Sequence, residues 1–275
     1  MKAMMKKVIV FATVVKSFRR LFVMIIGLML TVSVLIAPQA QAQDDGAGKI
    51  LKAMSDYMAA QKSVSLTFDS DIEVMTSDLQ KIQFTSSGQL QLVRPNKLRA
   101  SRVGGYRAVE IVFDGMTLTI SDEDSNSFAQ VDTPGSIDQL VDRLRNDHAI
   151  IAPGADLLFS SVYDIMMADV IDAKHIGLGV IDDVECEHLA FRTPDTDWQI
   201  WIAAGDHPVP CKYVITSKAL TGAPQYTLRI RDWGADVPAD AFVFKPPQGA
   251  QKVALEDLEH IDEVPPGVIA VGGMK

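Results

Sequence analysis

The sequence predicts a mostly β (α+β) fold: a single, strongly curved antiparallel sheet, or incomplete β-barrel, whose concave face is covered by helices. Apolar and polar residues alternate through most of residues 64–233, which is the pattern of strands with one buried face. Turn motifs separate these segments, and helical spacing of apolar residues is confined to three short stretches. A long meander has exposed edges, and sheets relieve them by curling or closing.

The first 42 residues have the parts of an export signal. Six basic residues precede an uncharged run from Leu21 to Ile36, and Ala40-Gln41-Ala42 supplies the small-x-small pattern of a signal-peptidase site. We expect cleavage before Gln43, where no cysteine is present to carry a lipid anchor. The alternative is an uncleaved N-terminal anchor, but the apolar run is short of the ~20 residues that span a bilayer. A periplasmic protein is therefore expected.

Removal of this segment makes the chain strongly acidic. The remaining residues carry 20 Lys and Arg against 35 Asp and Glu, a net charge of −15. Nucleic acids and anionic lipid surfaces require excess positive charge, so neither is expected as a partner. Residues 43–253 are long enough for one large domain, and residues 254–275 form an acidic tail with Pro and Gly that we expect to be poorly ordered.

The order of the elements follows from the apolar spacing. A first helix is expected over 48–61, and two more are expected at 136–147, where Ser136 and Gln139 have capping-box spacing, and at 154–167. Asp114-Gly115 is a hairpin signal between two strands. The strands are expected near 64–74, 82–92, 97–103, 106–113, 116–120, 128–131, 173–180, 184–192, 198–203, 211–217, 225–233 and 242–244.

The two cysteines are expected to stay free and partly buried, unless a one-residue bulge changes the register. The turns place Cys186 opposite Ala203 and Cys211 opposite Ile202, hence on opposite faces and two strands apart. Neighbouring strands lie about 4.8 Å apart, so two steps exceed the ~7 Å limit on the Cα separation of a disulfide.

No motif for catalysis or metal binding is found. The five histidines lack zinc-ligand spacing, and neither a G-x-S-x-G elbow nor a phosphate-binding glycine loop occurs. His188, on a strand beside Trp201, is expected to be a packing residue. A basic cluster of Lys97, Arg99, Arg102 and Arg107 is expected to pair with Asp69, Asp71 and Glu73, although it could also meet an acidic partner. We therefore expect no enzyme, no metal and no cofactor.

The strands bury an apolar face, which allows two interpretations. The helices fill the concavity completely and make an ordinary core, or they leave a cavity for an apolar ligand. Methionines on the expected helices, at 54, 58, 166 and 167, suit adaptable contacts. The residues expected to line such a cavity are Phe68, Ile72, Phe84, Leu118, Met166, Phe191, Trp198, Ile200, Leu228 and Ile230.

Several motifs resemble a known family. They are Val112-Phe113-Asp114-Gly115-Met116-Thr117-Leu118, Thr133-Pro134-Gly135-Ser136-Ile137, His188-Leu189-Ala190-Phe191-Arg192 with Asp197-Trp198-Gln199-Ile200-Trp201-Ile202, and Phe242-Val243-Phe244-Lys245-Pro246-Pro247. The pattern resembles the periplasmic proteins grouped as domain of unknown function 2092, from about residue 48 to 253. Where that family has a basic residue after the Pro210 position, this chain has Cys211.

The family is similar in architecture to the outer-membrane lipoprotein-sorting proteins LolA and LolB, which have an incomplete barrel lidded by helices. The resemblance implies a hydrophobic cavity able to hold acyl chains, but fold alone does not carry function. Arg99 and Arg102 are possible strand positions for the carrier's functional arginine, and no local motif fixes the match.

Two functions follow as hypotheses. The first is a monomeric, non-enzymatic periplasmic protein that holds a lipid or a lipoprotein acyl chain between sheet and helices. The second is an envelope-stress regulator or adaptor that binds the periplasmic segment of a membrane protein.

Overall fold

The computed structural model describes residues 45–147, 150, 152–258, 261, 263–265 and 268. The chain divides into two compact units, Met1–Ala42 and Gln43–Lys275, and every described residue belongs to the second. The expected export signal lies outside the described residues. Among the helices that are described, none is long and apolar enough to cross a membrane.

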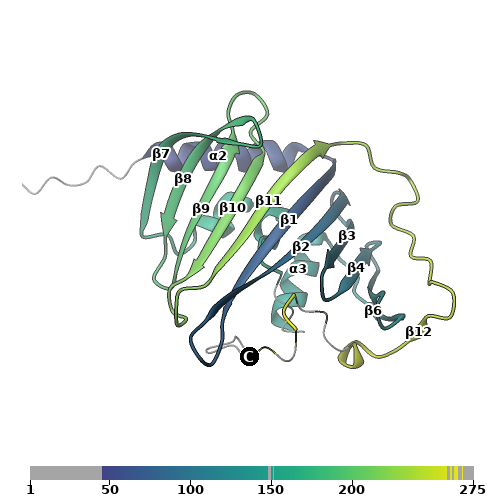
Figure 1. Cartoon of the computed structure of the whole chain (residues 1–275). Helices are drawn as coiled ribbons and strands as arrows, with labels where there is room; N and C mark the ends of the chain where they lie inside the picture. The colour runs from purple at the N-terminus through teal and green to yellow at the C-terminus, as the bar shows by residue number, and fades with distance from the viewer. Residues whose placement is uncertain are drawn as a thin grey trace, which may run out of the picture. The chain divides into compact units, whose positions relative to one another are not determined.

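The second unit is built on one open sheet of 12 strands, shown in Figure 1. The strand order is β12-β6-β5-β4-β3-β2-β1-β11-β10-β9-β8-β7, and every neighbouring pair is antiparallel except β12 with β6. The strands are β1 (Ser63–Met75), β2 (Lys81–Val93), β3 (Lys97–Gly104), β4 (Ala108–Phe113), β5 (Thr117–Asp122), β6 (Ser127–Asp132), β7 (Asp172–Ile181), β8 (Val184–Arg192), β9 (Thr196–Ala203), β10 (Pro210–Ser217), β11 (Gln225–Gly234) and β12 (Gln251–Lys252).

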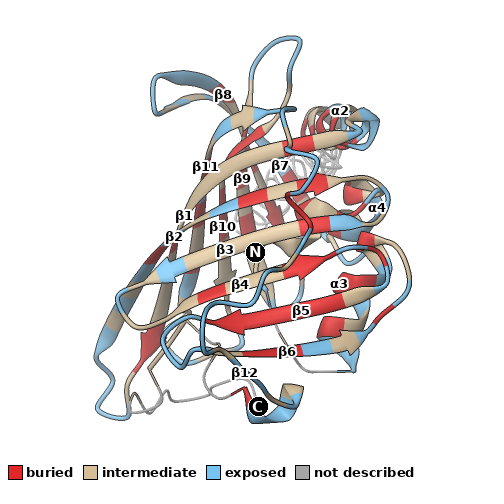
Figure 2. Ribbon diagram, turned by 90° about the vertical axis from the view of Figure 1, so that its right-hand side faces the viewer, coloured by how far each residue is buried: buried red, intermediate tan, exposed pale blue. Residues whose placement is uncertain are grey.

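Helices lie on one side of this sheet, as the side view in Figure 2 shows. They are α2 (Asp45–Ala60), α3 (Ile137–Asn146) and α4 (Val162–Met167), with a 3-10 turn, η1 (Ala155–Leu158), before α4. The predicted capping box of α3 is present, because Ser136 and Gln139 exchange side-chain to backbone hydrogen bonds. The mostly β, helix-covered architecture that the sequence predicts is confirmed.

The predicted helix over 154–167 is wrong, because it is broken into η1 and α4. Phe159 is extended at the break, and the Asp138 carboxylate of α3 accepts hydrogen bonds from the backbone N–H and the hydroxyl of Ser160. A side chain that captures a backbone donor in this way offers the chain an alternative to the helical ladder.

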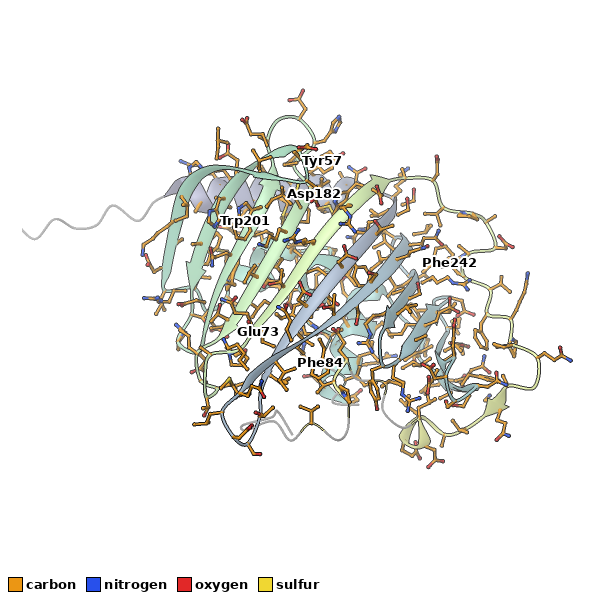
Figure 3. All side chains as sticks on the ribbon, in the orientation of Figure 1. Tyr57, Glu73, Phe84, Asp182, Trp201 and Phe242 are labelled. Carbon is orange, nitrogen blue, oxygen red and sulfur yellow. The ribbon has the colours of Figure 1, made fainter. Side chains whose placement is uncertain are left out.

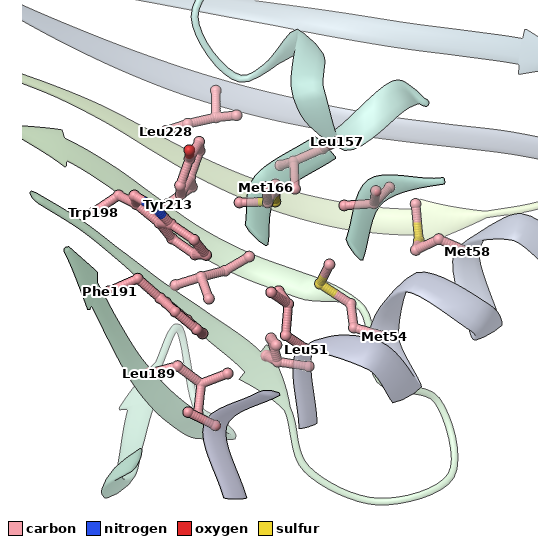
Figure 4. Packing of buried hydrophobic residues seen from close by; sticks show 14 of the residues in the cluster. Leu51, Met54, Met58, Leu157, Met166, Leu189, Phe191, Trp198, Tyr213 and Leu228 are labelled. Atoms are coloured by element: carbon pink, nitrogen blue, oxygen red, sulfur yellow. The ribbon is translucent and has the colours of Figure 1, made fainter. Parts of the chain in front are cut away.

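Two apolar clusters separate the concave face into halves. The first packs α2, η1 and α4 against β7–β11 and includes Leu51, Met54, Met166, Phe191 and Trp198, shown in Figure 4. The second packs α3 against β2–β6 and includes Leu92, Phe113, Leu118, Ile120 and Leu140. Leu66 and Trp233 contact both clusters, so the two halves are joined through β1 and β11.

The chain after β11 passes around the β6 edge of the sheet (Figure 1). Ala241 and Phe242 lie on the outer face, where the Ala241 carbonyl accepts from Arg99 and the Phe244 ring packs on Phe128 at 5.2 Å between centroids. The strand predicted at 242–244 is therefore wrong, and the sequence did not predict β12. Beyond β12, Leu258 and Ile261 pack against the second cluster on the concave side.

The predicted register is corrected at Cys211. Cys186 pairs with Ala203 as predicted, but Ile202 pairs with Pro210, and a bulge between Pro210 and Lys212 holds Cys211. Both cysteines are free and buried, but their side chains lie within hydrogen-bonding reach of each other, so the predicted placement of the two thiols on opposite faces is wrong. Burial is the largest cause that raises the pKa of the Cys186 thiol, and the neighbouring Cys211 thiol is the second; together they raise it to about 12.

Candidate ligand-binding site

Between the two clusters, several described residues of the concave face are only partly buried. Three consecutive rows of paired residues cross β11, β1, β2 and β3 here, and we call them the central rows. They are Tyr226–Ile72–Phe84, Leu228–Ser70–Ser86–Gly104 and Ile230–Phe68–Gly88–Arg102. Phe68, Ile72 and Phe84 are half-buried, so this part of the face presents an apolar wall that helices do not seal.

Polar side chains occupy the middle of this apolar wall. Ser70 is 0% exposed and Ser86 is 5% exposed, although both point to the face that the alternation makes apolar. Arg102 follows them on β3, with only 20% of its side chain exposed. Buried polar groups are costly unless they are hydrogen-bonded, so these residues require partners.

The partner is a carboxylate from the C-terminal part of the chain. Glu263 Oε1 lies 3.2 Å from Nη1 of Arg102, and Glu263 Oε2 accepts from the Ser70 hydroxyl at 3.2 Å. Arg102 Nη2 also donates to the Ile261 carbonyl at 2.6 Å. Burial raises the pKa of the Tyr226 phenol, and the negative charge of Glu263 raises it further.

A half-open cavity of about 360 Å³ lies at this place. Phe84, Ser86, Arg102, Arg107 and Glu263 are among the residues that line it. The Arg107 guanidinium is paired with the buried Asp122 carboxylate at 3.1 Å. The volume of this cavity is at the lower end of the volumes of pockets that hold small ligands. In Figure 3, Phe84 lies toward the lower end of the sheet, away from Phe242.

The structure distributes the ten expected cavity residues over three places. Phe84 lines the 360 Å³ cavity, and Phe68 and Ile72 lie half-buried beside it in the central rows. Leu118 is buried under α3 in the second cluster. The other six are buried in the first cluster, beneath α2, η1 and α4: Met166, Phe191, Trp198, Ile200, Leu228 and Ile230.

The expected pairing of the basic cluster is wrong. Arg99 pairs with Glu110 at 2.7 Å, whereas Arg102 and Arg107 pair with Glu263 and Asp122. Because β1 lies between β2 and β11 and not beside β3, its carboxylates meet other cations: Asp69 meets Arg231, and Glu73 meets Lys81.

The described residues offer no arrangement for metal chemistry, since no group of three or more His, Cys, Asp and Glu side chains converges among them. His188 stacks on Trp201 with ring centroids 4.0 Å apart and bonds Gln199 at 2.9 Å. It is a packing residue, as predicted. The central rows combine an apolar wall with the Arg102 cation and the Ser70 hydroxyl, a composition suited to binding an amphiphilic molecule.

The sequence interpretation missed Ser70, Ser86 and Glu263. A signal for the two serines was present, because they occupy inward positions of otherwise apolar strand faces. Glu263 had none, since it lies in an acidic stretch with no periodicity.

A second surface of interest is the hairpin of β7 and β8. Ile176, Leu178, Val180 and Val184 are exposed there, Leu178 by 62% and Val180 by 67%. β7 is the last strand of the sheet, so its outer edge has no strand partner in the described chain. The hairpin lies close to the outer face: Gly179 lies near the Trp201 ring, and Asp182 approaches Arg231 of β11 at 3.9 Å. Asp182 and Trp201 are labelled in Figure 3.

Comparison with solved structures finds similar chains at low sequence identity. The lipoprotein LppX of Mycobacterium tuberculosis has 15% sequence identity and a TM-score of 0.44, over 72% of this chain and 100% of its own. A LolA-superfamily protein of Nitrosomonas europaea has 14% identity and a TM-score of 0.33, over 72% and 97%. The MucA/MucB complex of Pseudomonas aeruginosa gives 12% identity and a TM-score of 0.40, over 73% and 61%.

No curated protein sequence matches the chain. The family described as predicted periplasmic protein (DUF2092) matches residues 47–256, which include the twelve described strands, α3, α4 and all of α2 but its first two residues. The match covers more than half of the sequence, and its range contains the motifs around Trp198 and in the hairpin at Asp114. The chain is therefore a member of the DUF2092 family of predicted periplasmic proteins.

Proposed function

We propose that the protein is a non-enzymatic, monomeric periplasmic binding protein that holds an apolar ligand, a lipid or a lipoprotein acyl chain, between the sheet and its helices. The observation that carries the proposal is the half-buried wall of Phe68, Ile72 and Phe84, in which Phe68 and Ile72 border the first cluster and Phe84 belongs to neither cluster. Ligand sites are typically concave and apolar, with a few placed polar groups, and the central rows have this composition.

The cover of the first cluster supports an adaptable site. α4 has only six residues, and the contacts of α2 and α4 with the sheet include Met54, Met58 and Met166. Unbranched thioether side chains repack at low cost. A movement of α4 would extend the wall from Ile72 toward Leu228 and Trp198, which are buried beneath the helices.

The test is recovery of a bound ligand from the full-length protein. Native mass spectrometry of protein purified from the periplasm should show a mass increment that organic extraction removes and identifies as a lipid. Phe84→Ser should reduce the fraction of protein molecules that carry the mass increment. Gln89→Ser, at an exposed position on the same strand, should leave that fraction unchanged. Repeated recovery of ligand-free protein that also binds no added lipid would contradict the proposal.

A second candidate function is an adaptor that binds the periplasmic segment of a membrane protein. The exposed apolar residues of the β7–β8 hairpin favour it, because an edge strand can accept an extended segment as an additional strand. A photo-crosslinker at position 178 should then capture one protein in stoichiometric amount. In the chain that carries the crosslinker at 178, Val180→Ser with Val184→Ser should abolish that capture and leave lipid binding unchanged.

A further inference from the structure

The contacts of Glu263 occupy both oxygens of its carboxylate. One oxygen faces the Arg102 guanidinium and the other accepts from the Ser70 hydroxyl. The Glu263 side chain is 10% exposed, so the ion pair is largely removed from water. An apolar sheet face has no packing reason to contain a buried serine and an arginine in adjacent rows, and each is costly there without an acceptor.

The surroundings of this carboxylate are asymmetric in polarity. Two of the central rows contain polar groups: one holds Ser70 and Ser86, and the next holds Arg102. On the other side of the Ser70–Ser86 row lies the row of Ile72 and Phe84, which are apolar. A molecule whose carboxylate replaced that of Glu263 would therefore have its next atoms against an apolar wall. That arrangement fits an amphiphile with a carboxylate at one end of an alkyl chain.

Glu263 belongs to no strand, so breaking its contacts with Ser70 and Arg102 would remove no strand pairing of the sheet. Leu258, which is 7% exposed, belongs to the second cluster and anchors the chain after β12. Arg102 bonds the Ile261 carbonyl and Glu263, and Ser70 bonds Glu263. Release of Glu263 would leave the Arg102 cation unpaired beside the neutral Arg107–Asp122 pair, which gives the empty site one net positive charge.

We propose that Ser70 and Arg102 form a carboxylate-binding site for a long-chain fatty acid, and that Glu263 of the chain's own C-terminal segment occupies this site until the fatty acid displaces it. The inference rests on the proposed function, because the alkyl chain must lie on the wall of Phe68, Ile72 and Phe84. It adds the chemical class of the ligand and an intramolecular competitor for its head group.

The experiment compares an acid with its neutral ester. Oleate and methyl oleate are titrated separately into delipidated full-length protein below their aggregation limits, and binding is followed by calorimetry. The wild type should bind oleate more tightly than methyl oleate, but by less than the about tenfold that a hydrogen bond to a charged group contributes, because oleate must displace the Glu263 carboxylate. Arg102→Met should remove this preference. Arg99→Met, on the same strand but the outer face, should retain it.

The competitor is tested by a second pair of variants. Glu263→Gln should raise the affinity for oleate several-fold and leave that for methyl oleate unchanged, because it removes the competing charge. Glu256→Gln, an exposed position nearby in the sequence, should have no effect. Hydrogen exchange supplies a readout in the wild type: oleate should increase exchange in peptides that contain 261 and 263–265, whereas methyl oleate should not.

The outcomes separate the two proposals. Equal binding of acid and ester by the wild type, or an oleate preference that survives Arg102→Met, would overturn the carboxylate site and leave the apolar binding function standing. If Arg102→Met does not fold, the Glu263→Gln comparison and the exchange measurement decide the question. Absence of binding of either compound to any variant would overturn both proposals.

Discussion

Asp197 shows how a single carboxylate fixes a strand junction. Its two oxygens accept from Arg192 at 2.8 Å each, and Lys218 at the end of β10 lies 2.8 Å from Oδ1. The hydrogen bonds from Arg192, and then those from Lys218, lower the pKa of Asp197 well below its usual value of 3.8. The ionised carboxylate therefore holds β8, β9 and β10 together at one end.

Asp197→Asn should reduce the free energy of unfolding by about 1 kcal/mol at neutral pH, an amount limited by the partial exposure of the group. Because the folded-state pKa is lowered, the stabilisation is fully present above the unfolded pKa and is lost as the pH falls through the folded value. Urea unfolding at pH 7 and below pH 3.8 should show the difference from wild type shrinking toward zero.

Asp195→Asn is the matched control, since Asp195 is exposed in the same turn. It should change stability little at either pH. A difference between wild type and Asp197→Asn that stayed constant down to the lowest pH would contradict the electrostatic account.

At the scale of the strand, Gly88 makes room for a neighbouring ring. An added Cβ would lie 2.3 Å from Cζ of Phe68 and 2.2 Å from the Ser101 carbonyl oxygen. The Phe68 ring therefore crosses β2 at the one position without a side chain, and this places it in the central rows. The backbone conformation of Gly88 is not one that requires glycine, so the constraint at this position is steric.

Gly88→Ala should lower the free energy of unfolding by about 1–3 kcal/mol, the range for overpacking. The Phe68 ring must shift, so lipid binding should weaken as well. Gly105→Ala is the control, because nothing lies within 4 Å of its added Cβ, and it should be neutral or slightly stabilising. Thermal unfolding of both variants measures the contrast, and equal effects would refute the steric explanation.

Elements with a regular pattern were predictable, and those set by distant contacts were not. The alternation of β1, β8 and β11 and the capping box at Ser136 follow from local chemistry, and the structure contains them. The break at Phe159 depends on Asp138, and the bulge at Cys211 depends on its partner strand. Neither signal is local.

The candidate site was predictable only in its apolar part. The inward residues Phe68, Ile72 and Phe84 follow from strand alternation, and they lie in the central rows as the pattern indicates. The meeting of Ser70 with Glu263 joins positions 193 apart in the sequence, and no periodicity links them. The alternation at 242–244 predicted a strand, but these residues lie in a loop whose aromatic side chains pack on the outer face of the sheet.

At the scale of the whole molecule, one sheet connects two cores. The three tryptophans lie on β9 and β11, at positions 198, 201 and 233, so the half under α3 contains none. Leu66 and Trp233 nevertheless contact both clusters. We therefore expect the second unit to unfold in one cooperative transition.

Leu140→Ala, in α3 of the second cluster, should lower the free energy of unfolding by about 2–5 kcal/mol, because Leu140 is 1% exposed. Fluorescence of Trp198 and Trp201, measured in a Trp233→Phe background because Trp233 contacts both clusters, should shift to the same denaturant midpoint as far-UV circular dichroism. Separate midpoints for the two signals would show that the halves unfold independently.

The pairing of β1 with β11 also determines how late in synthesis the sheet can complete its folding. Asp69 and Arg231, which meet across these strands, are 162 positions apart. While the chain is being synthesised, β1 can pair with β2 early, but its other edge stays open until Gln225–Gly234 is made. A prematurely terminated chain would thus present a bare, apolar strand edge to any other chain it met, which makes incomplete synthesis an aggregation hazard for this protein.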